Sequence, residues 1–88
     1  MHDEKHIILG VHITDRIRDA AGVQQVFTEF GCNIKTRLGL HHVTDDVCSP
    51  RGLILLEVHG DESVAETMAE RLSAFEGVQV RTMVFDHP

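Results

Sequence analysis

The sequence predicts a single α+β domain whose elements follow the order strand, helix, strand, strand, helix, strand. Eighty-eight residues are enough for one hydrophobic core, and 42% hydrophobic with 25% charged residues is an ordinary globular composition. In three segments apolar residues alternate along the chain, as in strands with one face in a core, and residues 53–56 form a continuous apolar stretch of strand size. In two other segments they recur at three- and four-residue spacing, as in amphipathic helices.

The first half of the chain predicts a strand, a helix and a second strand. In residues 7–13 the odd-numbered positions are all apolar, which is the period of a half-buried strand. Apolar residues at helical spacing follow over residues 20–30. In the second strand, over residues 34–40, we expect the even-numbered residues to face the core and Lys35 and Arg37 to lie on the outer face.

The second half repeats this plan after a loop. Turn-forming residues predict the loop over residues 43–52. A strand is then expected over residues 53–59, a helix over residues 63–76 and a last strand over residues 78–85. The helix has a line of apolar residues on its predicted buried side, namely Val64, Met68, Leu72 and Phe75.

Two strand-helix-strand halves restrict the topology of the sheet. Right-handed crossovers favour the strand order 4-1-3-2, with all neighbours antiparallel and both helices on one face. This is the ferredoxin-like βαββαβ arrangement. We expect residues 1–88 to form one domain, with its core over about residues 6–86.

Charge and composition exclude several classes of function. A net charge of −6 and the absence of Trp and Tyr argue against direct binding of nucleic acid, which needs clustered cations and stacking surfaces. The longest apolar stretches are strand-sized, and residues 1–5 are polar and acidic, so no membrane association and a cytoplasmic location are expected. No combination of nucleophile, base and orienting residue is visible, so we expect no enzyme activity.

Two segments resemble ACT domains, a family of amino-acid-sensing βαββαβ modules. These are residues 30–34 (Phe-Gly-Cys-Asn-Ile), at the end of the first helix, and residues 14–16 (Thr-Asp-Arg), after the first strand. The resemblance implies a ligand-responsive regulatory domain, with its ligand near the ends of the first two strands. The candidate ligand-binding residues are His12, Asp15, Arg37 and His41.

Nearly the whole chain is similar to the iron-only hydrogenase system regulator family, which consists of stand-alone ACT-like domains. The likeness lies in residues 37–40 (Arg-Leu-Gly-Leu), 52–58 (Gly-Leu-Ile-Leu-Leu-Glu-Val) and 75–78 (Phe-Glu-Gly-Val). The chain also resembles the C-terminal domain of the nickel-responsive repressor, where a histidine and a cysteine six positions later bind the metal. His42 and Cys48 have this spacing, although the DNA-binding segment of the repressor is absent here.

Histidine is unusually frequent, with seven residues in the chain. In the predicted sheet the first and second strands end at the same edge, which brings His12 towards the second-strand end and the loop that follows. Imidazole and thiolate groups suit zinc or nickel, so the candidate metal ligands are His41, His42 and Cys48. Surface imidazoles in water are the alternative.

A second group of histidines is expected at the opposite edge of the sheet. His6 begins the first strand, His59 ends the third and His87 follows the fourth, all on the outer face by strand parity. Fraying of the chain end at His87 is the alternative to a site here.

The residues expected on the face of the sheet away from the helices indicate what the chain binds. Apolar and charged residues share this face by parity: Ile8, Leu55, Met83 and Phe85, with Lys35, Arg37, Glu57 and Arg81 around them. An uncovered apolar patch with a charged rim is typical of an interface, so we expect a homo-oligomer, a dimer or a tetramer. Three functions stay open: a ligand-responsive regulatory domain, a divalent-metal binding domain and a purely structural assembly module.

Overall fold

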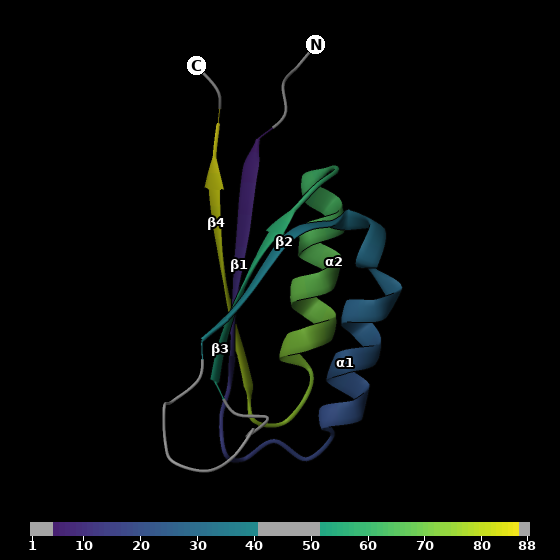
Figure 1. Cartoon of the computed structure of the whole chain (residues 1–88), viewed down its shortest axis with the longest axis vertical. Helices are drawn as coiled ribbons and strands as arrows, with labels where there is room; N and C mark the ends of the chain where they lie inside the picture. Colours follow the sequence, from purple (N-terminus) through teal and green to yellow (C-terminus); the bar gives the residue numbers. More distant parts are fainter. Residues whose placement is uncertain (1–4, 41–51, 87–88) are drawn as a thin grey trace.

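A four-stranded antiparallel sheet with two helices on one face forms the domain (Figure 1). The computed structural model describes residues 5–40 and 52–86. The strand order is β2-β3-β1-β4, which is the predicted order 4-1-3-2 read from the other edge. The elements are β1 (His6–Ile13), α1 (Ala20–Glu29), a 3₁₀ turn η1 (Gly31–Asn33), β2 (Ile34–Leu40), β3 (Gly52–Val58), α2 (Glu62–Ser73) and β4 (Val78–Phe85).

Strand β1 is the centre of the fold, because it pairs with β3 on one side and with β4 on the other. Its odd-numbered residues are buried as the alternation predicts, with exposed fractions of 3% or less: Ile7, Leu9, Val11 and Ile13. Its even-numbered residues point away from the helices. The two faces of β1 therefore have different environments.

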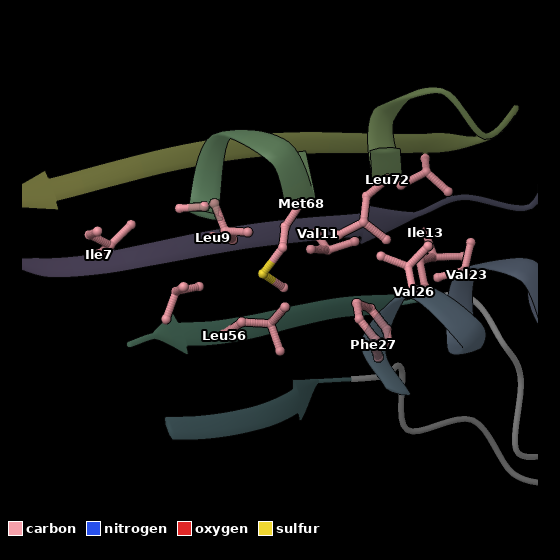
Figure 2. Packing of buried hydrophobic residues seen from close by; sticks show 13 residues of the cluster. Ile7, Leu9, Val11, Ile13, Val23, Val26, Phe27, Leu56, Met68 and Leu72 are labelled. Carbon is pink, nitrogen blue, oxygen red and sulfur yellow. The ribbon is translucent and has the colours of Figure 1, made fainter. Parts of the chain in front are cut away.

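The core lies between this side of the sheet and the two helices. Figure 2 shows Met68 and Leu72 directed from α2 towards the sheet, beside Leu9, Val11 and Leu56. Helix α1 adds a second group of buried side chains, Val23, Val26 and Phe27. Among the described residues no polar or charged side chain is buried, so the core is held by apolar packing alone.

The segment between β1 and α1 is fixed to the turn before β4. The backbone NH and the hydroxyl of Thr14 both donate to the carbonyl oxygen of Gly77, at 2.8 Å each. Gly77 has a φ of +84°, and a Cβ atom there would collide with the backbone of Arg16 and Ile17. This junction therefore requires glycine both for its conformation and for its space.

The predicted orientation of β2 is wrong from Thr36 onwards. A β-bulge between Ile34 and Thr36 adds one residue to the strand and reverses the alternation. Arg37 consequently pairs with the buried Leu56 and lies on the helix side, whereas Leu38 pairs with Leu55 on the outer face. Arg37 is thus removed from the predicted outer-face patch.

In the parts of the chain that the structure describes, neither α1 nor α2 has the length and apolar character needed to cross a membrane.

Candidate functional site

The outer face, defined here as the side of the sheet away from the helices, carries an uncovered apolar surface. Leu38, Met83 and Phe85 have exposed fractions of 51%, 54% and 50%, and Leu53 is 37% exposed. Ile8 and Leu55 are half-buried between them. The predicted apolar residues of this face all lie on it, and Leu38 joins them because of the bulge in β2.

Gly10 occupies the middle of this face. It lies in β1, between Leu55 of β3 and Arg81 of β4. A Cβ atom at Gly10 would make only ordinary contacts, 3.8 Å from Leu55 Cδ2 and 4.0 Å from the Arg81 carbonyl oxygen. Neither its space nor its backbone conformation in the single chain therefore requires glycine. Glycine in a central strand often marks a close approach by a ligand or another backbone, so Gly10 is a signal of contact that sequence reasoning missed.

Charged groups of both signs surround the apolar residues. The carboxylate of Glu57 lies 3.3 Å from Nδ1 of His6 and 3.8 Å from Nζ of Lys35. Glu57 therefore forms an ion pair with Lys35 of β2 on this face. On the other side of Gly10, Arg81 is exposed and donates to the carbonyl oxygen of Val80 at 3.1 Å.

Arg37, a predicted ligand-binding residue, lies on the helix side of the sheet. Its guanidinium group is 4.7 Å from the ring centre of Phe27, and its Nη2 donates to Oε1 of Gln24 at 3.4 Å. The predicted position of Arg37 on the outer face is therefore wrong. Arg37 and His12 lie on opposite faces of the sheet.

The other predicted ligand-binding residues are near one end of the sheet. His12 and the last residue of β2, Leu40, both pair with Leu53, so the ends of β1 and β2 are close as expected. Nδ1 of His12 lies 3.4 Å from Oε1 of Gln79, and Asp15 is exposed in the turn after β1. His41 lies outside the described residues.

The predicted metal ligands His41, His42 and Cys48 also lie outside the described residues. Within residues 5–40 and 52–86 no group of three or more His, Cys, Asp or Glu side chains is arranged to hold a metal ion. The metal site therefore stays a prediction.

Of the second histidine group, His6 and His59 are described and His87 is not. Ile7 pairs with Val58, which places His6 and His59 at the same end of the sheet. The backbone of His59 is fixed by Asn33, because its NH donates to the Asn33 carbonyl at 2.6 Å and the Asn33 amide donates to its carbonyl at 3.0 Å. This end of the sheet is thus tied to the turn before β2.

Ion pairs at the surface of the domain, away from the outer face, connect elements that are distant in sequence. Arg71 of α2 donates to both carboxylate oxygens of Glu29 in α1, at 3.0 and 2.8 Å. These hydrogen bonds hold the pKa of Glu29 below its ordinary value of 4.5. Similarly, the hydrogen bond to Glu62 at 2.8 Å raises the pKa of Lys5.

Comparison with known proteins supports the fold alone. No family model matches the chain, and no curated protein matches it. Among solved structures it is similar to the uncharacterized protein TM1266 from Thermotoga maritima, with a TM-score of 0.76 and 21% sequence identity. The match covers 93% of this chain and 98% of that protein, so the two share the arrangement of the whole domain.

Proposed function

We propose that the chain is an ACT-like, ferredoxin-like regulatory domain that works as a homo-oligomer, with the outer face of one copy packed against that of another. The observation that carries this proposal is the apolar outer face, where three side chains are each about half exposed. Large apolar side chains grouped on one side of a sheet favour an interface, because pairing removes them from water.

A second copy of the chain suits this face better than a strongly charged partner. The face carries one anionic residue, Glu57, and two cationic residues, Lys35 and Arg81. Two copies packed face to face therefore do not bring together surfaces of the same charge. Gly10 supplies a position without a side chain at the middle of the face, where two sheets can approach closely. Twofold pairing of identical patches is the commonest form of self-association.

The regulatory part of the proposal rests on the resemblance to ACT domains. A small ligand, such as an amino acid, would bind where β1 and β2 end, near His12 and Asp15. Ligand binding at the end of the sheet would change the self-association, since both involve β1. Divalent-metal binding by His41, His42 and Cys48 is the alternative that the resemblance to the nickel-responsive repressor implies.

A thermal-shift screen tests the regulatory proposal. The purified chain is heated with single amino acids, with zinc or nickel salts, and with a chelator as control. A ligand present at 100 times its Kd stabilises the folded state by about 2.7 kcal/mol, so a specific amino acid should raise the melting midpoint clearly. Stabilisation by a metal only, reversed by the chelator, would favour the metal alternative. No shift with any ligand would leave the assembly module as the function.

A further inference from the structure

A groove lies on the helix side of the sheet, between α2 and the edge strand β4. Its volume is about 460 Å³. One wall consists of α2 residues, and the floor consists of the β4 residues Val80, Thr82 and Val84. Val84 is 37% exposed although it belongs to the core-facing side of β4. The floor of the groove is therefore partly apolar, and no described residue covers it.

The α2 wall of the groove is acidic. Glu62, Glu66 and Glu70 follow one another at four-residue spacing, so they form one line along the helix. Like charges at this spacing destabilise a helix. Lys5 binds Glu62, whereas Glu66 and Glu70 have no ion-pair partner among the described residues. The two carboxylates next to the floor of the groove thus remain open to a cation from outside.

The adjoining edge of β4 can accept another strand. Within the described sheet, β4 pairs with β1 and with no strand on its other side. Its eight residues contain no proline, and their outward backbone groups form a row of donors and acceptors. A strand added at such an edge gains main-chain hydrogen bonds, and its alternate side chains extend over the neighbouring face.

The charges on the α2 wall indicate which kind of strand can pair with β4. If β4 of a second copy paired at this edge in antiparallel orientation, the α2 helices would lie on the same face, with two acidic walls opposite each other. The core-facing residues of β4, which would enter the groove, are Val78, Val80, Thr82 and Val84, and none is a cation. A net charge of −6 on each chain adds to the repulsion. A second copy is therefore disfavoured here.

We propose that the α2–β4 groove binds an extended, basic segment of another protein, which adds to the sheet beside β4. Lysine or arginine at alternate positions of that segment would lay their aliphatic stems over Val80 and Val84. Their charged groups would reach Glu66 and Glu70. This surface lies on the opposite side of the sheet from the proposed self-association face. The two proposals can therefore be tested independently of each other.

A peptide titration tests the proposal on the full chain. The probe is a capped, fluorescent peptide of about eight residues in which lysine alternates with threonine, the length of β4. A peptide with glutamate in place of lysine is its charge control, and an N-methylated version that cannot pair along a strand is its backbone control. Anisotropy should show saturable binding of the lysine peptide alone.

Variants of the chain locate the binding surface. Glu66→Gln with Glu70→Gln should weaken binding about tenfold, the loss expected for two exposed ion pairs. Glu29→Gln with Glu76→Gln removes the same charge away from the groove and should leave binding unchanged. Equal binding by both double variants, or equal binding of the N-methylated peptide, would overturn the proposal. So would failure of the lysine peptide to bind, or pairing of two wild-type copies through β4.

Discussion

The two faces of the sheet use the same strands and have opposite relations to the solvent. On the helix side, the odd-numbered residues of β1 are buried against α1 and α2. On the outer face, Leu38, Met83 and Phe85 are just as apolar and remain half exposed. Over β1 the first face is completed by the helices of the same chain, whereas no described residue covers the apolar side chains of the second face. Hydrophobic character along a strand thus predicts where contact occurs, but not whether the contact lies within one chain.

The largest expected difference between the two faces concerns leucine truncation. Leu56 is fully buried, so Leu56→Ala should lower the free energy of unfolding by about 2–5 kcal/mol, through lost transfer energy and a cavity. Leu38→Ala, on the outer face, should change the stability of the single chain by no more than about 0.5 kcal/mol. Urea denaturation at low protein concentration measures both. Comparable losses in the two variants would mean that the outer face is packed within one chain.

Glycine gives a second contrast, between the turn before β4 and the outer face of the sheet. Gly77→Ala forces a side chain into a left-handed backbone conformation and against Arg16 and Ile17, and it should cost about 1–3 kcal/mol. Gly10→Ala has room in the single chain and should raise its stability slightly, because alanine restricts the unfolded state. Thermal melts of dilute protein report both effects. A large destabilisation by Gly10→Ala would show that this position serves the fold itself.

The smallest expected effect comes from the ion pair between the helices. The pKa of Glu29 is lower in the folded chain, because Arg71 binds its charged form. Its contribution to stability is therefore present above the unfolded pKa and is lost as the pH falls through the folded pKa. Wild type should be slightly more stable than Glu29→Gln at pH 7, and the difference should vanish in acid. If the stability difference between wild type and Glu29→Gln persists at the lowest pH values, it arises from packing and not from the ion pair.

Much of the fold could be predicted from the sequence, because the alternation in β1 and the helical spacing in α2 are governed by one buried core. Leu9, Met68 and Leu72 lie where these periods place them. The face of Arg37 could not be predicted in this way. A β-bulge changes the parity of a strand through one extra residue, and no residue type near Ile34 identifies it.

The candidate site could be predicted only in part. The apolar outer face follows from strand parity once the helices are assigned to the other side. The candidate residues His41, His42 and Cys48 follow the end of β2, where no period of buried residues determines side-chain direction. The α2–β4 groove depends on how far the helices extend over the edge of the sheet, which is a property of packing and not of any one segment.

Sedimentation velocity of three proteins tests the central claim, that the outer face joins copies of the chain. Wild type should be a dimer or larger at micromolar concentration. Leu55→Asp places a charge at the centre of the outer face and should give a folded monomer, as circular dichroism would verify. Ala21→Asp, which adds the same charge on the exposed part of α1, should sediment like wild type. A monomeric wild type would contradict the claim outright. An unchanged oligomer in Leu55→Asp would place the interface elsewhere, at an edge of the sheet.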